Sequence, residues 1–230
     1  MSATLAFDVY ATLIDTHGVD SKLREMIGPQ AAAFSRTWRD KQLEYAYRRG
    51  LMQNYRNFAF CTSSALEFTC SYFRISLSNE QTSELLGIYR LLPPFDDVER
   101  GLIQLKSAGY RMFAFSNGSR EAVEELLVGA KLREYFLGIL SVDDMRTFKP
   151  NPAVYSYFLR ESGASGGDAW LISGNPFDVI GAVSAGMKSI WVRRSEDQIF
   201  DPWGIDPTLV VNGFDDLSTG IAKYQSGEHS

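Results

Sequence analysis

Six short apolar runs alternate with segments of helical periodicity, and this alternation constrains the fold of the chain more than any other feature. The runs lie at 5–7, 112–115, 138–141, 170–173, 189–192 and 209–211, and helices are predicted between them at 97–109, 119–129, 151–162, 177–186 and 214–225. Nearly continuous apolar strands separated by helices are typical of parallel sheets that are covered on both faces. The sequence therefore predicts an α/β fold, with a Rossmann-like parallel sheet and helices on both faces.

One long segment interrupts this alternation directly after the first strand. No proline occurs between Gln30 and Leu92, and apolar residues recur at helical spacing over 34–51. Further helices are predicted at 62–74 and 78–91, the second opened by a capping box of Ser78 and Gln81. The predicted domains are an α/β core at 1–14 and 97–225 and a helical-bundle cap at 15–96, with a frayed tail at 226–230.

Composition excludes several classes of protein. The 230 residues carry a net charge of −5 and contain two cysteines and two histidines. Those counts argue against a disulfide framework and against a zinc site built from Cys and His. The acidic balance argues against a nucleic-acid partner, and no run of 18 apolar residues is present to span a membrane. The N-terminus has neither a basic region nor a cleavable apolar stretch, so we expect a cytoplasmic protein.

Four polar clusters follow predicted strands, at 8–12, 116–119, 149–150 and 173–178. Taken alone, each cluster reads as a turn, a helix N-cap or a solvated lysine. Ligands in parallel α/β sheets bind beyond the carboxyl ends of the strands, so all four clusters should meet at one edge. The sequence thus predicts a single pocket that contains Asp8, Ser116, Lys149 and Asp178.

These clusters resemble the motifs of the haloacid dehalogenase superfamily, in which an Asp nucleophile follows the first strand. Later motifs in the sequences of this family contain a Ser or Thr, a Lys and an acidic residue. Ser116, Lys149 and Asp178 match these three motifs. The segment 38–45, together with Leu51, Met52, Tyr55 and Phe58, resembles the cap of the L-2-haloacid dehalogenase branch in particular. The resemblance covers nearly the whole chain. It implies a hydrolase that acts on carbon–halide bonds without a cofactor and that forms a homodimer.

Tyr10 and Asn175 set the chain apart from the phosphatases of this superfamily. Phosphatases need a second Asp two positions after the nucleophile to protonate an alkoxide, and Tyr10 occupies that position. They also bind Mg²⁺ through carboxylates of the fourth motif, whose early acidic position is Asn175 here. A halide leaves without a proton, so dehalogenation without a metal is favoured. The alternatives are a phosphatase, a hydrolase acting on a fluorinated acid or on a strained ring such as azetidine-2-carboxylate, and a non-catalytic binding module.

The expected mechanism has two displacements at one carboxylate. Asp8 attacks C2 of a short L-2-haloalkanoate to form an aspartyl ester, and water hydrolyses the ester to a D-2-hydroxyalkanoate. Lys149 keeps Asp8 ionised, and Asp178 activates or orients the water. The other predicted catalytic residues are Ser173 and Asn175, expected to hold Asp178 and Lys149 in place, and Thr12, expected to bond the Asp8 loop.

Substrate-binding residues are expected from both predicted domains. Donors for the substrate carboxylate are the Ser116 hydroxyl and the backbone N–H groups of Val9 and Tyr10. The family resemblance implies that Arg39, Asn117 and Phe177 receive the departing halide. The predicted apolar wall consists of Val9, Tyr10, Leu43, Phe58 and Phe177, and Tyr155 is expected to bond to the site from the helix after Lys149.

Three residues depart from the family pattern. Ala11 stands where Gly is usual, Asp40 follows Arg39 where Gln is usual, and Pro176 fixes a backbone angle in the fourth motif.

A separate feature concerns assembly, because the predicted cap carries more aromatic residues than a small bundle needs. We read this surplus as an interface for a homodimer; it comprises Tyr45, Tyr47, Tyr55, Phe58 and Phe60.

Overall fold

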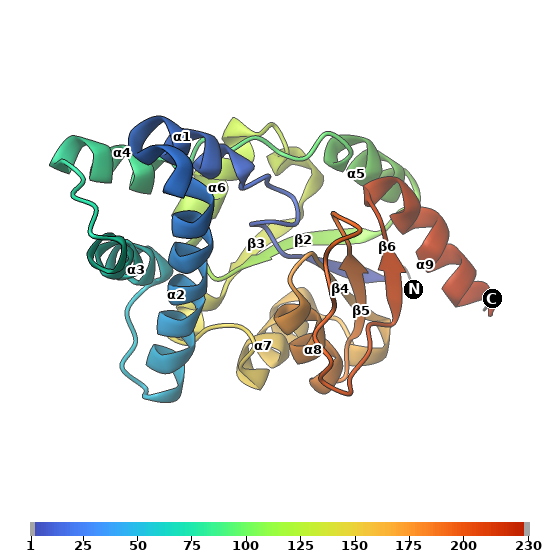
Figure 1. Ribbon diagram of the computed structural model, residues 1–230. Coiled ribbons are helices and arrows are strands. Elements are labelled where there is room, and N and C mark those ends of the chain that lie inside the picture. The colour runs from blue at the N-terminus through green and yellow to red at the C-terminus, as the bar shows by residue number, and fades with distance from the viewer. Residues whose placement is uncertain (1–2, 228–230) are drawn as a thin grey trace.

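A computed structural model describes residues 3–227, and a six-stranded parallel sheet runs through its centre (Figure 1). The strands are β1 (Thr4–Phe7), β2 (Arg111–Ser116), β3 (Gly138–Ser141), β4 (Ala169–Ser173), β5 (Lys188–Val192) and β6 (Leu209–Val211). Their order is β3-β2-β1-β4-β5-β6, and each neighbouring pair is parallel. The predicted α/β class and all six predicted strands are confirmed. Strand β1 is central, so a residue that follows it lies in the middle of the sheet edge.

Helices cover both faces of the sheet because the side chains of each strand alternate between the faces. Leu5 and Phe7 of β1 face α5 (Val98–Ser107), α6 (Arg120–Gly129) and α9 (Leu217–Ser226) in one apolar cluster. Ala6 faces the other cluster, with α7 (Pro152–Ser162) and α8 (Pro176–Ser184), which lie below the sheet in Figure 1. Short 3₁₀ turns lie at Gly28–Gln30, Arg133–Tyr135, Val142–Met145, Gly166–Asp168 and Phe214–Asp216.

Four helices inserted between β1 and α5 form the left part of Figure 1. They are α1 (His17–Ile27), α2 (Ala31–Leu51), α3 (Phe58–Phe73) and α4 (Asn79–Ile88), and we refer to them as the inserted helices. The capping box of Ser78 and Gln81 is present at the start of α4, as predicted. Helix α1 was not predicted. Only Val19 and Leu23 along it are buried, and two apolar positions are too few to show the helical spacing in the sequence.

The chain crosses between the inserted helices and the sheet twice, and the two crossings pair with each other. Ile14 forms an antiparallel bridge with Pro94, and the Phe95 amide donates to the Leu13 carbonyl at 3.1 Å. Arg194 secures this junction, donating 2.7 Å hydrogen bonds to Asp97 and to the Thr12 carbonyl. These crossings lie at the predicted domain limits, which themselves stay a prediction.

Aromatic contacts join the inserted helices to the rest of the molecule on several sides. Ring centroids lie 6.1 Å apart for Tyr10 and Tyr89, and 5.6 Å apart for Tyr47 and Phe177. The rings of Tyr55 and Phe58 lie 5.2 and 6.1 Å from that of Phe148. Phe58 is therefore buried, Tyr47 and Tyr55 are half-buried against these rings, and Tyr45 packs against Phe68. Of the five aromatic residues predicted to form an interface, only Phe60 is exposed, and packing within the chain covers the other four at least in part.

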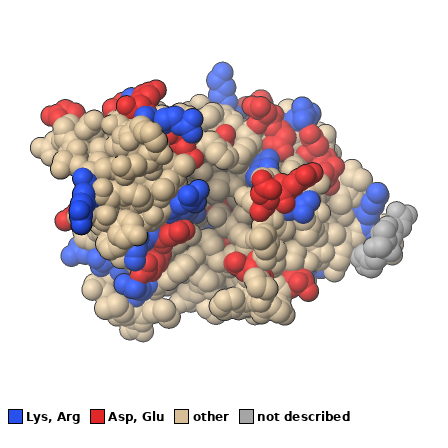
Figure 2. All heavy atoms as spheres, viewed as in Figure 1, with Lys and Arg blue, Asp and Glu red and all other residues tan. Residues whose placement is uncertain are grey.

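Surface and termini add little to the fold. The face drawn in Figure 2 carries interspersed acidic and basic side chains. Among the described residues, no helix is both long enough and apolar enough to cross a bilayer. Ser226, the first residue of the predicted frayed tail, is instead the last residue of α9, and Gly227 caps that helix. Positions 228–230 of the predicted tail lie outside the described residues.

Candidate active site

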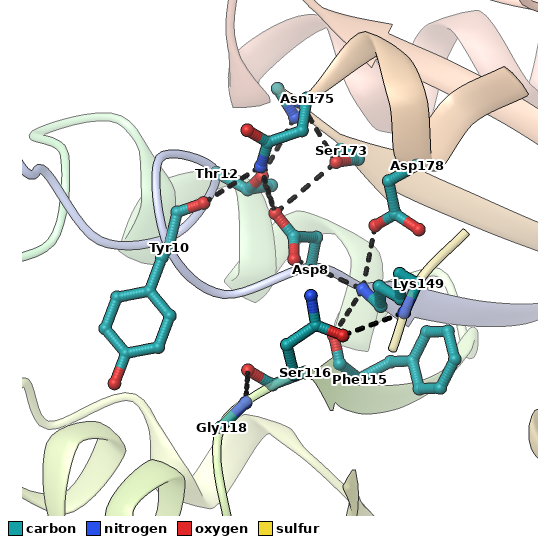
Figure 3. Close-up of polar contacts among 12 residues, drawn as sticks. Asp8, Tyr10, Thr12, Phe115, Ser116, Gly118, Lys149, Ser173, Asn175 and Asp178 are labelled. Carbon is teal, nitrogen blue, oxygen red and sulfur yellow. Dashed lines mark hydrogen bonds and ion pairs between the residues drawn. The ribbon is translucent and has the colours of Figure 1, made fainter. Parts of the chain in front are cut away.

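Asp8 lies directly after β1, and four side chains hold its carboxylate (Figure 3). Thr12 Oγ1 donates to Asp8 Oδ2 at 2.7 Å, and Asn175 Nδ2 donates to the same oxygen at 2.8 Å. Ser173 Oγ lies 3.4 Å from Oδ2, whereas Lys149 Nζ donates to Oδ1 at 3.2 Å. Hydrogen bonds and a cation therefore stabilise the ionised carboxylate and fix its orientation.

This arrangement corrects the roles predicted for Ser173 and Asn175. Both were expected to hold Asp178 and Lys149, but their side chains contact Asp8 instead. The Ser173 hydroxyl also accepts from the backbone N–H of Asn175 at 3.1 Å, so the two residues support each other. The bond between Thr12 and the Asp8 loop is present as predicted.

The loop that carries Asp8 turns through Ala11, whose φ of +61° lies in the left-handed region. Gly174 packs so closely on this turn that a Cβ there would lie 2.4 Å from the Ala11 carbonyl oxygen. The Gly174 amide donates to Thr12 Oγ1 at 2.8 Å and ties the two loops together. The absence of a side chain at 174 thus allows the contact that orients Thr12 toward Asp8.

Ala11→Gly is expected to raise the free energy of unfolding by up to about 1 kcal/mol, because glycine adopts the left-handed conformation without the Cβ penalty. Urea denaturation measures the change. Ala130→Gly is the matched control, since Ala130 ends a helix with a right-handed φ of −78°. The control should lower stability by about 0.4–1 kcal/mol. Equal destabilisation by both variants would contradict the strain assigned to Ala11.

Lys149 is 1% exposed, and its ammonium is shared between two carboxylates. Its Nζ donates to Asp178 Oδ2 at 2.7 Å, to Asp8 Oδ1 at 3.2 Å and to the Phe115 carbonyl at 2.8 Å. Burial alone lowers the pKa of Lys149, but the charges of Asp178 and Asp8 outweigh burial and raise it. Lys149 is therefore a fixed cation between the two acids.

Asp178 is fully buried at the start of α8 and faces Lys149. Burial raises the pKa of Asp178 to about 6, against the opposing effect of Lys149, and the charge of Asp8 raises it further. The Tyr155 hydroxyl donates to Asp178 Oδ1 at 2.8 Å, and burial keeps the pKa of Tyr155 well above its ordinary value. Asp178 can thus exchange a proton near neutral pH, while Tyr155 stays a hydrogen-bond donor.

Donors for an anion lie on the other side of Asp8. In the described part of the chain, the amides of Val9 and Tyr10 have no hydrogen-bond acceptor. The Ser116 hydroxyl accepts from the Gly118 amide at 3.1 Å, so its own proton stays available to a ligand. Asn117 Oδ1 accepts from the Lys149 amide at 3.0 Å and links the predicted second and third motifs.

A cavity of about 760 Å³ lies between the inserted helices and the loops that follow β1 and β2; Tyr10 and Ala11 of the Asp8 loop line it, whereas Asp8 itself does not. Of the predicted substrate-binding residues, Tyr10, Arg39 and Phe58 line it. The Val9 side chain instead packs in the apolar core, which corrects its predicted place in the wall and leaves only its backbone available. Leu43, Ser116, Asn117, Tyr155 and Phe177 are not part of the lining, and Phe177 packs on Tyr47.

Arg39 connects the inserted helices to the Asp8 cluster. Its Nη2 lies 3.5 Å from Asn175 Oδ1, and the amide of Asn175 in turn binds Asp8. Its Nη1 donates to Gln42 Oε1 at 2.6 Å. Sequence reasoning did not identify Gln42, although its place three residues after Arg39 on a helix was a usable signal. It also missed Gly174 and Arg194, which act through Thr12 and follow no local pattern.

Two features bear on phosphatase chemistry. The Tyr10 ring points away from Asp8 in Figure 3 and packs against Tyr89. Burial raises the pKa of Tyr10 to about 12, so the phenol stays protonated. Within residues 3–227, no group of three or more His, Cys, Asp or Glu side chains is placed to hold a metal ion.

Comparisons with known proteins agree with this geometry. The family model for haloacid dehalogenase-like hydrolases matches residues 6–192. An (S)-2-haloacid dehalogenase of Pseudomonas putida is 35% identical over 95% of this chain and 96% of its own length. A second (S)-2-haloacid dehalogenase, from Pseudomonas fluorescens, is 34% identical over 94% and 95%. A solved L-2-haloacid dehalogenase of Xanthobacter autotrophicus, with chloropropionic acid covalently bound, has a TM-score of 0.87 at 26% identity, over 96% of this chain and 99% of that one.

Proposed function

The chain belongs to the haloacid dehalogenase-like hydrolases, and on that premise we propose that it hydrolyses short L-2-haloalkanoic acids to D-2-hydroxyalkanoic acids through an ester on Asp8. One observation carries the proposal. The carboxylate of Asp8 is paired with Lys149 as its cation, directly before the cavity-lining residues Tyr10 and Ala11, and the ring of Tyr10, which stands where a phosphatase has its second Asp, points away from it. Such a site can form a covalent intermediate, and it suits a leaving group that needs no proton.

In the first step, an Asp8 carboxylate oxygen attacks C2 of the substrate from the side opposite the halogen. The new C–O bond forms as the carbon–halogen bond breaks, so halide leaves with the bonding electron pair and the configuration at C2 inverts. Lys149 keeps Asp8 ionised, and the hydrogen bonds from Thr12 and Asn175 hold it in one orientation. Ser116 and the free amides of Val9 and Tyr10 bind the substrate carboxylate.

In the second step, water attacks the carbonyl carbon of the Asp8 ester. Asp178 takes the proton from this water and returns it to the alkoxide oxygen of the departing hydroxyacid. The Lys149 ammonium, which contacts both acids, stabilises the oxyanion that forms on Asp8. Attack at the carbonyl leaves C2 untouched, so an L substrate gives a D product.

Halide release places a new anion beside the inserted helices. Arg39 is the cation that reaches the Asp8 cluster from this side, through Asn175. We assign the halide to Arg39, with Asn117 and Phe177 as the remaining predicted members of the cradle. Asp40 is exposed and also lines the cavity, so solvent screens its charge.

Chloride release from L- and D-2-chloropropionate in the presence of EDTA tests the proposal. We expect release from the L enantiomer alone, at a rate that EDTA does not change, because Lys149 supplies the positive charge that a metal would otherwise supply. Phosphate release from p-nitrophenyl phosphate with Mg²⁺ is the comparison arm. Activity there without any chloride release would replace dehalogenation with phosphatase chemistry.

The rate of ester hydrolysis is expected to fall as the pH drops below about 6, since Asp178 must be ionised to accept a proton and its pKa is raised to about 6. The charge of Asp8 contributes to this raised pKa, and the ester removes that charge. The midpoint for hydrolysis should therefore lie below the value for the free enzyme. Single-turnover quench experiments measure hydroxyacid formation separately from halide release. A hydrolysis rate independent of pH between about 4 and 8 would contradict the assignment of Asp178.

A homodimer is part of the proposal. Large apolar side chains are exposed on α3 and where α2 ends, and an interface would cover them. They are Leu51, Met52, Phe60 and Tyr72. Sedimentation should give a species of about twice 25.8 kDa, and a single species at 25.8 kDa across micromolar concentrations would remove this part. The cytoplasmic location stays a prediction from the sequence.

A further inference from the structure

We propose that Gln42, braced by Thr62, positions the Arg39 guanidinium for the departing halide and so determines how well the enzyme expels chloride relative to bromide. This inference rests on the proposed function, because it concerns the first step of that reaction. Gln42 and Thr62 are positioning residues, and they act through Arg39.

Gln42 is 2% exposed on α2, and both ends of its side-chain amide are bonded. Its Oε1 accepts from Arg39 Nη1 at 2.6 Å, and its Nε2 donates to Thr62 Oγ1 at 2.6 Å. The oxygen and nitrogen of this amide cannot exchange places, because the guanidinium of Arg39 contains only donors and needs an acceptor. The Thr62 hydroxyl uses its proton on the Phe58 carbonyl at 2.9 Å, so it accepts from Gln42.

These bonds form a continuous path from α3 to the nucleophile. Thr62 and Gln42 hold one end of the guanidinium, and Arg39 Nη2 then meets Asn175 Oδ1 at 3.5 Å. Asn175 Nδ2 donates to Asp8 Oδ2 at 2.8 Å. Arg39, Gln42 and Thr62 also line the cavity. A buried amide costs free energy unless its partners are kept, so this one is suited to hold Arg39 in place.

Arg39 has a long side chain with many rotamers, and the bond to Gln42 removes much of that freedom before substrate arrives. Charge develops on the halogen only as the carbon–halogen bond breaks, so a fixed guanidinium stabilises the transition state more than the bound substrate. Chloride is the poorer leaving group and depends more on this stabilisation than bromide. A loosened Arg39 should therefore slow release of chloride more than release of bromide.

The test measures single-turnover halide release from L-2-chloropropionate and L-2-bromopropionate. Gln42→Met keeps the length of the side chain and removes both hydrogen bonds. We expect release of chloride to slow about ten- to a hundredfold, and release of bromide to slow by less than about fivefold. A purely structural defect would slow both substrates by the same factor.

Position 62 gives a second pair of variants with a matched control on the same helix. Thr62→Val removes the hydroxyl that braces Gln42 and should shift the chloride-to-bromide ratio in the same direction, whereas Thr62→Ser should restore it. Thr69 is fully buried, and its hydroxyl makes the same type of bond, to the Ala65 carbonyl four residues back at 2.7 Å. Thr69→Val should leave the ratio at the wild-type value.

The outcomes separate this inference from the proposed function. Wild-type enzyme that releases neither halide would refute the proposed function. Wild-type enzyme that releases both, with an unchanged ratio in Gln42→Met and Thr62→Val, would refute only the role of Gln42 and Thr62. If Gln42→Met does not fold, Thr62→Val and Thr62→Ser decide, and equal shifts in Thr62→Val and Thr69→Val would overturn the inference.

Discussion

Asp8→Asn is expected to abolish dehalogenation, with chloride release from L-2-chloropropionate reduced by at least about 10⁴-fold. A neutral amide is a poor nucleophile and cannot form the ester. Asn is close in shape to Asp, but its one side-chain oxygen can accept either from Thr12 or from Lys149 and not from both, so circular dichroism and thermal melting must verify that the variant folds. Asp168→Asn, at an exposed position in a 3₁₀ turn, is the control and should keep full activity.

Isotope labelling separates the ester mechanism from direct attack by water. A single turnover in H₂¹⁸O with excess enzyme should place the label on the Asp8 carboxylate and leave the first hydroxyacid largely unlabelled. Solvent oxygen then enters the product only in later turnovers, because the oxygen of Asp8 is the one transferred to C2. Label in the product of the first turnover would mean that water attacks C2 directly, and the role of Asp8 as nucleophile would be lost.

Asp178→Asn is expected to separate the two steps of the reaction. Halide should appear in a burst of up to one equivalent per active site, after which turnover slows by about 10²–10⁴-fold because no base activates water for ester hydrolysis. Lys149 keeps its contact with Asp8, so the nucleophile stays paired. Mass spectrometry of the stalled enzyme should find the added mass of the 1-carboxyethyl group on the peptide that contains Asp8.

A missing burst would give Asp178 a different role. Lys149 shares its ammonium between Asp178 and Asp8, at 2.7 and 3.2 Å, so loss of Asp178 can also displace the lysine. Asp178→Asn without a burst would show that Asp178 is needed before hydrolysis, to position Lys149. Tyr155→Phe is the companion variant, since it removes only the bonds of the hydroxyl to Asp178, to Oδ1 at 2.8 Å and to the backbone carbonyl at 3.1 Å, and it should keep the burst.

Local pattern was sufficient to predict the sheet and the convergence of Asp8, Lys149 and Asp178. Each of these residues is placed by a buried strand or by the segment that follows it, and parallel strands bring their carboxyl ends together. The pattern could not specify which side chain bonds to which. Ser173 and Asn175 were placed at the correct edge but on the wrong partner, because the choice between Asp8 and Asp178 depends on side-chain directions across two loops.

Other parts of the site depend on contacts between distant segments. Arg194 reaches the Thr12 carbonyl across 182 positions of sequence, and Gln42 reaches Thr62 from one helix to the next. Neither contact leaves a periodic trace in the sequence. Ala11 was predictable in part. The family usually has Gly at this position, which indicated a special backbone conformation, and the backbone does turn there with a φ of +61°.

The aromatic contacts between the inserted helices and the rest of the molecule oppose any separation of the two that would open the site to solvent. Opening by rotation at the paired crossings would separate the rings of Tyr10 from Tyr89, of Tyr47 from Phe177, and of Tyr55 and Phe58 from Phe148. At about 0.5–1.5 kcal/mol for each ring pair, these contacts alone favour the closed form by about 2–6 kcal/mol. Against these contacts alone, an open form would be populated between a few per cent and a few molecules in a hundred thousand. Substrate entry and hydroxyacid exit must therefore wait for a rare opening or pass through the mouth of the cavity, so the rate of this exchange sets an upper limit on turnover.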